Sequence, residues 1–440
     1  MLIQFRVKNF KSFKDEQILS LVASPDTNLS DNTISIRALR KMKLVKSAIM
    51  YGANASGKSN LVSAINFVKE FVTKSAVVRP DSLIPVRRFQ LDTERKQPSE
   101  FEITFIHEEV RYEYGFSVDE KRIYDEWLIA FPKGVAQTWF ERPTKSDASE
   151  EEWYFGRHLK GEKNKLIPLT RPNVLFLSVA AKFNNPQLSS IYEWFSEKLN
   201  IIDDETPSQI LELMTLRTIQ DSEDLHVKVR NLLKVADLGI VDFSVEETPV
   251  VNTPMDIPQD APEQIKAFFS MLTKISQNSD SEHMRQLSVA MRHQIEEGDT
   301  TGVKFGFNDE SRGTRRLFGL SSLLFSVLQK GGLLVIDELD SSLHPVLARE
   351  LLNMFHNPKI NKNGAQLLFN THDTTLLDLS LFRRDQIWFM EKDNRGISHL
   401  YSLLDFKPRK TEAISKGYLQ GRYGAIPFLS NIEEFFAHGS

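Results

Sequence analysis

Alternating and periodic apolar positions divide the first part of the chain into strands and a helix. Residues 2–13 and 16–24 alternate between apolar and polar side chains, which predicts two strands. Residues 47–51 form a short apolar strand, and from Lys58 onward apolar residues recur at helical spacing. The pattern therefore predicts a strand, a glycine-containing turn and a helix in direct succession.

Aromatic and branched residues then mark a series of antiparallel strands. The expected strands cover residues 101–106, 110–118, 122–131, 137–142 and 152–156. The segments 79–99 and 143–152 contain Pro, Ser and charged residues, which predicts loops. A short apolar run at 173–178 follows.

The middle of the chain has a mainly helical pattern from about residue 186 to 296. A strand and turn at 241–251 and a linker-like segment at 252–262 are expected to interrupt it. After residue 303, strands and helices alternate again, with short apolar segments typical of buried parallel strands.

We therefore predict an α/β protein with three regions. Residues 1–180 contain the first half of the α/β unit and the antiparallel β subdomain. Residues 181–300 form a mainly helical, acidic insertion, and residues 301–440 form the second half of the α/β unit.

Composition excludes several classes of protein. The chain has 440 residues, of which 41% are hydrophobic and 26% charged, as in globular proteins. No apolar run is long enough for a membrane span, and the charged start of the chain does not have the pattern of a signal peptide. The absence of cysteine excludes disulfides, thiol catalysis and cysteine-bound zinc, and it fits a cytoplasmic location.

Charge is unevenly distributed along the sequence. Residues 201–300 contain 19 acidic and 8 basic residues, a net charge of −11, within a chain of net charge −4. The remaining residues therefore carry +7. The acidic block disfavours contact with phosphate groups, whereas the mildly basic remainder permits it. The simpler interpretation is that both are ordinary solvated surfaces.

A phosphate-binding loop is the most specific motif. The pattern Gly-x-x-x-x-Gly-Lys-Ser is formed by Gly52, Ala53, Asn54, Ala55, Ser56, Gly57, Lys58 and Ser59, with Asn60 as a further candidate contact. Backbone N–H groups and the start of the following helix would bind the phosphates of a nucleotide. Lys58 adds a positive charge, and the Ser59 hydroxyl would bind Mg²⁺.

A second motif is an apolar strand, Leu333–Ile336, that ends in Asp337 and Glu338. Asp337 at the tip of a buried strand would hold Mg²⁺ beside the phosphate loop. Glu338 would polarise an attacking water molecule. A surface turn would explain two such carboxylates taken alone, but not their pairing with the phosphate loop.

Two further features lie at fixed spacing from Asp337. Ser311, Gly313 and Thr314 open an apolar helix 26 residues before Asp337, where a second anion-binding turn is expected. The apolar segment that ends in His372 lies 35 residues after Asp337, and this order predicts a sensor of the terminal phosphate.

In this order of motifs the chain resembles ABC-type P-loop ATPase heads of the SMC and double-strand-break-repair families. The turn at Ser311 resembles their signature, although Arg312 replaces its first glycine. The segments ESRGTRRLFGL, LLVIDELDSSLHP and YLQGRYGAIPFL more closely resemble the RloA-like and PARIS-type ATPases of bacterial anti-phage defence. OLD nucleases carry the same kind of head.

The resemblance implies a head-to-tail homodimer or higher homo-oligomer that hydrolyses MgATP. ATP would lie between Gly52–Ser59 of one subunit and Ser311, Gly313 and Thr314 of the other. Glu338 would be the general base, Asp337 with Ser59 would hold Mg²⁺, and His372 would contact the γ-phosphate. Gln90 is a candidate for the glutamine ligand of such heads; an ordinary surface glutamine is the other interpretation.

Two expected absences narrow the function. Ser311 follows Ser59 by 252 positions, and the segment between them lacks sustained heptads, so no long coiled coil is expected. The 68 residues after His372 are occupied by head-like sequence, so no Toprim nuclease domain is expected in the chain.

The resemblance therefore implies a cytoplasmic ATPase that is not itself a nuclease. It would be the sensor, regulator or scaffold of an anti-phage abortive-infection system. Its partner would be a separately encoded effector, a Toprim-type nuclease, and its trigger a nucleic acid or a phage protein. The alternatives are a repair ATPase that binds DNA structures and an ATP-binding scaffold without turnover.

Overall fold

The computed structural model describes residues 1–92, 97–143, 153–236, 239–249, 285–295, 302–341, 343–409 and 412–426. The chain forms two compact units, of which the first comprises Met1–Thr206 with Ser326–Ser440 and the second comprises Pro207–Phe325. The second unit begins and ends later than the predicted insertion at 181–300, and the turn at Ser311 belongs to it. The second unit begins after residue 181 because the strand Leu199–Ile202 pairs with Leu333–Ile336 and so belongs to the first unit.

A six-stranded sheet in the first unit carries the phosphate loop. Its strand order is β11-β15-β16-β5-β17-β18. The strands are β5 (Ser47–Tyr51), β11 (Leu199–Ile202), β15 (Leu333–Ile336), β16 (Gln366–Asn370), β17 (Ile387–Lys392) and β18 (Ser398–Ser402). All neighbours pair in parallel except β17 and β18. Because β5, β15 and β16 are buried on both faces, they appear in the sequence as continuous apolar runs.

The second sheet of this unit is antiparallel and has the order β10-β9-β8-β7-β6-β1-β2. The strands are β1 (Leu2–Lys8), β2 (Gln17–Ser20), β6 (Ser99–His107), β7 (Val110–Val118), β8 (Ile123–Phe131), β9 (Gln137–Pro143) and β10 (Tyr154–Phe155). These strands confirm the predicted antiparallel series. A short ribbon of β3 (Thr33–Ser35) and β4 (Lys43–Val45) is separate.

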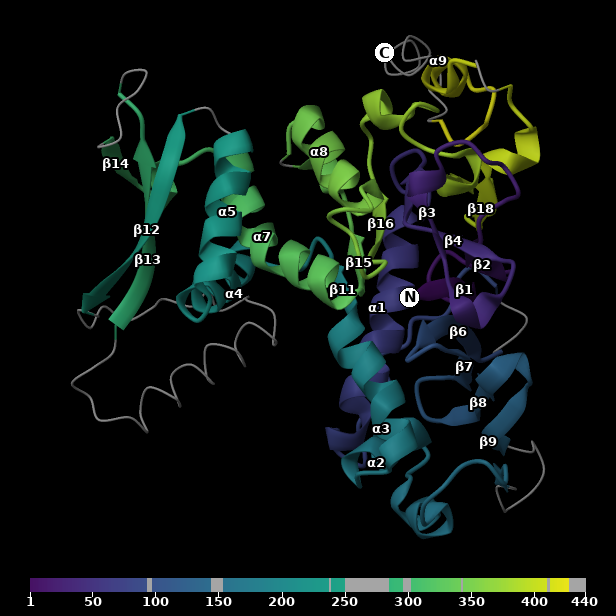
Figure 1. Ribbon diagram of the computed structural model, residues 1–440. Helices are drawn as coiled ribbons and strands as arrows, with labels where there is room; N and C mark the ends of the chain where they lie inside the picture. Colours follow the sequence, from purple (N-terminus) through teal and green to yellow (C-terminus); the bar gives the residue numbers. More distant parts are fainter. Residues whose placement is uncertain are drawn as a thin grey trace, which may run out of the picture. The chain divides into compact units, whose positions relative to one another are not determined.

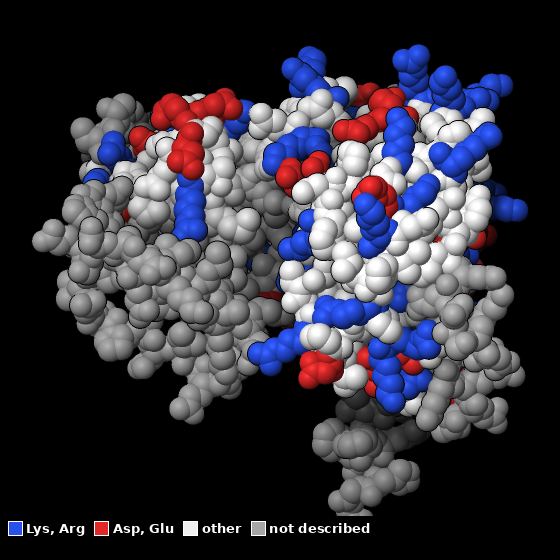
Figure 2. All heavy atoms as spheres, turned by 90° about the horizontal axis from the view of Figure 1, so that it is seen from below, with Lys and Arg blue, Asp and Glu red and all other residues white. Residues whose placement is uncertain are grey.

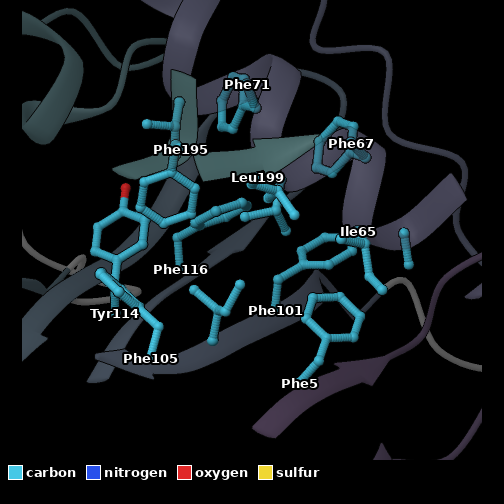
Figure 3. Close-up of a cluster of buried hydrophobic side chains, with 14 of the residues drawn as sticks. Phe5, Ile65, Phe67, Phe71, Phe101, Phe105, Tyr114, Phe116, Phe195 and Leu199 are labelled. Carbon is cyan, nitrogen blue, oxygen red and sulfur yellow. The ribbon is translucent and has the colours of Figure 1, made fainter. Parts of the chain in front are cut away.

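Helix α1 (Lys58–Lys74) lies between the two sheets (Figure 1). Its apolar residues recur at helical spacing, as the sequence predicts. Phe67 packs on Phe101 at 5.0 Å between ring centroids, and Phe71 packs on Phe116 at 5.4 Å. Figure 3 shows these rings between α1 and the strands of the antiparallel sheet. One continuous core therefore fixes the helix that follows the phosphate loop.

Two further described helices of the first unit, α2 (Phe176–Lys182) and α3 (Pro186–Glu193), contribute to this core, and two others, α8 (Pro345–His356) and α9 (Ile414–Leu419), lie outside it. At the end of the described chain, Tyr418 and Tyr423 each stack on Phe389 with centroids 5.6 Å away. Tyr418 also contacts Tyr51, the last residue of β5, at 5.6 Å. This segment therefore packs beside the start of the phosphate loop.

The second unit combines helices with a small sheet. Its elements are α4 (Ser208–Gln220), α5 (Glu223–Ala236), β12 (Ile240–Pro249), β13 (Arg285–His293), β14 (Val303–Gly306) and the start of α7 (Arg312–Lys330). The strand expected at 241–251 is confirmed as β12, but the helical interpretation of 285–293 is wrong. Apolar residues alternate at Leu287, Val289 and Met291, which suits the antiparallel pairing of β13 with β12 and β14. The linker-like segment 252–262 lies outside the described residues.

No helix in the described ranges is long and apolar enough to cross a membrane. This agrees with the absence of a long apolar run in the sequence.

A buried histidine anchors the first residue of β5. His356, at the end of α8, is 7% exposed, and its Nε2 lies 2.8 Å from Ser47 Oγ. Gln386 Nε2 donates to the same hydroxyl oxygen at 2.7 Å. The Ser47 hydroxyl can therefore donate its own proton to His356 Nε2. Burial, together with nearby Lys46, lowers the pKa of His356 to about 3. The imidazole is therefore neutral in the folded protein near pH 7.

This histidine predicts a loss of stability in mild acid. The pKa of His356 is lower in the folded than in the unfolded chain, so only the unfolded chain gains a proton as the pH falls below about 6.5. Between pH 7 and pH 5, the wild type should lose about 2 kcal/mol more unfolding free energy than His356→Gln. Urea unfolding followed by tryptophan fluorescence at each pH measures this difference. The exposed control His158→Gln should follow the wild type; equal pH dependence of all three proteins contradicts the prediction.

Candidate nucleotide-binding site

The phosphate loop connects β5 to α1 at the carboxyl edge of the parallel sheet. Gly57 has a φ of 118°, which residues with side chains rarely adopt. A Cβ atom on Gly52 would lie 2.4 Å from the carbonyl oxygen of Met390. Both glycines are therefore required by the backbone. The loop leads into the N-terminus of α1, whose first N–H groups lack partners within the helix.

Lys58 lies over this loop. It is 6% exposed, and its Nζ donates hydrogen bonds to the carbonyl oxygens of Gly52 at 2.8 Å and Ala53 at 3.1 Å. Burial lowers the pKa of Lys58 below its usual value, whereas the carboxylates that follow β15, Asp337 first, raise it. The ammonium group and these carboxylates therefore share one edge of the sheet.

Asp337 and Ser59 come together at this edge. Asp337 is 4% exposed and directly follows β15. The Ser59 hydroxyl, in the first turn of α1, donates to Asp337 Oδ1 at 3.2 Å. Two residues 278 positions apart in the sequence thus present oxygen atoms to the same point.

Asn370, the last residue of β16, connects the Asp337 carboxylate with the backbone of Glu338. Its Nδ2 donates to Asp337 Oδ1, and its Oδ1 accepts a hydrogen bond from the Glu338 backbone N–H at 2.9 Å. Glu338 has a φ of 51°, in the left-handed region that non-glycine residues seldom occupy. The amide of Asn370 therefore stabilises a strained backbone at the position of the proposed base. Sequence analysis missed Asn370, although its place two residues before His372, at the end of a buried strand, was a usable signal.

The oxygen atoms at this edge fit a magnesium ion held jointly with a nucleotide. Ser59 Oγ and Asp337 Oδ1 provide two oxygen ligands of the kind that Mg²⁺ prefers. Ser56 Oγ, in the loop, is buried without a hydrogen-bond partner in the described part of the chain. Among those residues, no cluster of three or more His, Cys, Asp or Glu side chains could hold a metal. A magnesium ion would therefore take its remaining ligands from nucleotide phosphates and water.

A family comparison agrees with this geometry. Residues 47–378 match the family described as "AAA domain, putative AbiEii toxin, Type IV TA system". The chain belongs to this AAA family. The matched segment contains the phosphate loop, both carboxylates after β15 and the end of β16. No curated protein matches the chain.

Several solved structures resemble the AAA chain at low identity. The SMC head domain from Thermotoga maritima is 14% identical, with a TM-score of 0.38 and coverage of 91% of this chain and 98% of that one. A structure titled as SmcHead bound to the C-winged helix domain of ScpA is 13% identical, with a TM-score of 0.43 and coverage of 92% and 99%. A structure titled as the recombination mediator RecF with ATP is 14% identical, with a TM-score of 0.32 and coverage of 91% and 97%.

The predicted fold class is confirmed. The AAA chain has a mixed α/β sheet with the phosphate loop after β5, and an antiparallel β subdomain beside it. It has the predicted fold of an ABC-type P-loop head.

The backbone of His372 is hydrogen-bonded to the side chain of Asp340. The His372 backbone N–H donates to Asp340 Oδ2 at 3.1 Å, which ties the loop after β16 to the loop after β15. Asp340 Oδ1 is buried without a partner among the described residues. The His372 side chain is exposed. Its predicted contact with a γ-phosphate stays a prediction.

Asn60 is used to support the loop. Its Nδ2 donates to Ser12 Oγ at 2.7 Å, and Ser398 Oγ lies 2.7 Å from the same hydroxyl and 2.6 Å from the Ser56 carbonyl oxygen. Two serines from β18 and from the turn after β1 therefore hold the start of α1. A contact of Asn60 with nucleotide stays a prediction.

Lys11 is a cation at this edge that sequence analysis missed. Burial, and then Arg87, lower the pKa of Lys11 below its usual value, whereas three carboxylates raise it. These belong to Glu205, Asp203 and Asp337. Lys11 also has a φ of 48°, so the turn after β1 holds it in a left-handed conformation near the carboxylates. A lysine in an alternating charged segment gave no sign of this placement.

Gln90 does not reach the phosphate loop through any contact found in the described ranges. It is exposed, and its Nε2 donates to the carbonyl oxygen of Arg88 at 3.1 Å. Its role as a nucleotide ligand stays a prediction.

The signature-like turn lies in the second unit, at the start of α7. The Ser311 hydroxyl accepts a hydrogen bond from the Thr314 backbone N–H at 3.1 Å and lies 2.9 Å from the Thr314 hydroxyl. This is the N-cap arrangement that a serine before a helix predicts, and Gly313 lies in the first turn. A contact of Ser311, Gly313 and Thr314 with nucleotide stays a prediction.

The Asn370 amide predicts a defect in turnover without a defect in nucleotide binding. Asn370→Leu keeps the side-chain volume but removes both hydrogen bonds, so Asp337 and Glu338 lose their common anchor. We expect ATP turnover to fall at least about ten-fold and to require more Mg²⁺, while affinity for ATP without Mg²⁺ stays within about three-fold. A coupled phosphate assay and equilibrium dialysis measure the two quantities. Asn363→Ala, an exposed control, should behave as wild type; unchanged Mg²⁺ dependence of Asn370→Leu contradicts the role.

Proposed function

We propose that this AAA chain hydrolyses ATP to ADP and phosphate in a head-to-tail dimer. The observation that carries the proposal is the chain of contacts from Ser59 to Asp337, from Asp337 to Asn370, and from Asn370 to the backbone of Glu338. It brings together a phosphate loop, the two oxygen atoms proposed to bind magnesium, and the backbone of the residue proposed as the base.

In the proposed reaction each residue has one task. The backbone of Gly52–Ser59 and the Lys58 ammonium group bind the β- and γ-phosphates. Ser59 and Asp337 orient Mg²⁺, which neutralises developing charge on the phosphates when it is bound. Glu338 accepts the proton of the attacking water, and His372 contacts the γ-phosphate.

We propose that a second copy completes the site. Its Ser311, Gly313 and Thr314 would face the γ-phosphate from the start of α7. Because Ser311 caps the helix through its hydroxyl, its orientation is already set before nucleotide binds.

We propose that residues 1–180 and 301–440 form the head and that 181–300 is its acidic insertion, although the second unit is bounded at Pro207 and Phe325.

Glu338→Gln tests the general base. We expect turnover to fall at least about 100-fold, because glutamine cannot accept the proton, while ATP binding is retained. The ATP-bound dimer should then accumulate, as measured by light scattering after size exclusion with and without MgATP. Glu350→Gln, on the exposed face of α8, is the matched control and should keep full turnover.

Each result has a distinct consequence. Full turnover by Glu338→Gln contradicts the assignment of the base. A wild-type protein that assembles with ATP but releases no phosphate contradicts hydrolysis and supports the alternative of an ATP-binding scaffold.

We further propose that the ATPase regulates a separately encoded effector, a Toprim-type nuclease, in cytoplasmic anti-phage defence that ends in abortive infection. The description of the family, which refers to a toxin of type IV toxin–antitoxin systems, supports a defence role. The resemblance of ESRGTRRLFGL and LLVIDELDSSLHP to defence ATPases supports it as well. ATP-driven closure would change the surface that the effector contacts. A phage protein or a nucleic acid would be the trigger.

Purification from the native locus, followed by mass spectrometry, tests the partner. We expect a stoichiometric nuclease whose activity differs between complexes with wild-type ATPase and with Glu338→Gln. Absence of such a protein would shift the weight to the second candidate, a DNA-structure-binding repair ATPase, which the net charge of +7 outside residues 201–300 permits. That candidate predicts DNA-stimulated turnover that falls steeply with salt.

A further inference from the structure

Three separate segments meet at one end of the first unit. The Arg171 guanidinium donates to the Val78 carbonyl oxygen at 2.7 Å, and the Asn173 amide donates to the Ser82 carbonyl oxygen at 3.0 Å. The Ile123 backbone N–H donates to the carbonyl oxygen of Pro172 at 2.9 Å. Residues 78–90, 119–123 and 153–187 are therefore neighbours, and we call them together the basic end.

The basic end concentrates positive charge in an acidic protein. Its three segments contain 11 basic and 4 acidic residues, a net charge of +7, whereas the whole chain carries −4. The rest of the chain therefore carries −11. Such a separation creates a local positive potential that the overall charge hides.

The cations of the basic end are turned to solvent. Seven of them are exposed: Arg79, Arg87, Lys121, Arg157, Lys160, Lys165 and Lys182. Lys165 pairs with Glu162 at 2.7 Å, but Arg79, Lys160 and Lys182 have no carboxylate within ion-pair distance in the described ranges. Figure 2 looks at this end of the first unit and shows blue Lys and Arg side chains spread across it, with fewer red side chains between them.

Exposed aromatic rings accompany these cations. Tyr154 is 54% exposed and Phe183 is 58% exposed. Phe183 follows Lys182 at the end of α2. The Asn185 amide donates to the Lys160 carbonyl oxygen at 2.9 Å, which places the end of α2 beside the 157–165 loop. A large apolar ring left in water between lysines needs a partner with a flat apolar face.

We propose that the basic end binds single-stranded nucleic acid. Arg157, Lys160 and Lys182 contact the phosphate backbone, and Phe183 stacks on a base. Cations interleaved with exposed aromatic rings are the surface that single strands require, because every base offers a face for stacking and every nucleotide a charge. An acidic protein segment would use the cations but not the ring in this way, and a duplex would keep its bases stacked away from Phe183.

The proposal does not depend on ATP turnover, because none of these residues belongs to the nucleotide site. It is tested with the full chain and fluorescein-labelled DNA and RNA single strands of roughly 30 nucleotides. Fluorescence anisotropy at several salt concentrations measures affinity. We expect binding whose logarithm falls linearly with the logarithm of salt concentration. The DNA and RNA arms identify which strand is preferred, and either one supports the proposal.

Reversing the charge of three cations tests whether the basic end is the binding surface. Arg157→Glu, Lys160→Glu and Lys182→Glu together should weaken binding at least about ten-fold and reduce the salt slope by about 2, since each phosphate contact contributes about 0.7 for single strands. The matched control reverses Arg409, Lys359 and Lys362, which are one arginine and two lysines exposed elsewhere on the first unit. It should bind within about two-fold of wild type. Both variants should unfold at the wild-type temperature; if the first does not, the glutamine triple at the same positions replaces it.

Phe183→Ala distinguishes stacking from charge alone. It should weaken single-strand binding about five-fold or more and leave weak duplex binding unchanged. The proposal is overturned if the wild type does not bind single strands at about 50 mM salt, or if the control reversal loses as much affinity as the test reversal. It is also overturned if heparin or vesicles of anionic lipid bind as tightly as single strands and equally well to Phe183→Ala.

Discussion

The parallel register of β15, β16 and β5 is the constraint on which the nucleotide site depends. Ile336 pairs with Phe369, and Asn370 pairs with Met50, so Asp337, Asn370 and the start of the phosphate loop fall at one level of the sheet. Because side chains alternate along a strand, a shift of one residue in β16 would turn Asn370 to the other face. The magnesium-binding pair and the backbone of Glu338 would then both lose their common hydrogen-bonding partner.

Helix α1 transmits this constraint into the core. Its first turn carries Lys58 and Ser59, while Phe67 and Phe71 pack against the antiparallel sheet. Close-packed rings on one side and the parallel sheet on the other leave the helix little freedom to tilt. The phosphate loop is therefore preorganised. Two hydrogen bonds connect the segments that follow β15 and β16: the Glu338 N–H donates to Asn370 Oδ1, and the His372 N–H donates to Asp340 Oδ2.

The sequence was sufficient to predict those features of the structure that depend on residues close together in the chain. The glycine pattern from Gly52 to Gly57, the apolar runs of buried strands and the helical spacing after Lys58 each depend on neighbouring residues. Contacts between distant residues were not predictable in the same way. Asn370 acts on Asp337 across 33 positions, and Lys11, which has a left-handed backbone conformation after β1, interacts electrostatically with Asp337 although the two are far apart in the sequence. β13 pairs with β12, which lies more than 35 residues before it, and with β14, which follows it more closely. In the sequence, only the alternation of Leu287, Val289 and Met291 marked β13 as a strand.

The same helix that begins at the phosphate loop ends at the basic end. The Ser178 hydroxyl of α2 donates to the carbonyl oxygen of Val72 at 2.6 Å. The Ser75 hydroxyl, just after α1, donates to the Ser178 hydroxyl at 2.9 Å. With 17 residues, α1 spans about 25 Å between the two places. A helix held by a continuous core moves as one body, so a displacement at Ser59 would reach α2, Lys182 and Phe183 without any change in the packing between them. Nucleotide and nucleic acid would then be coupled through one rigid element, and by thermodynamic linkage each would alter the affinity for the other by the same factor.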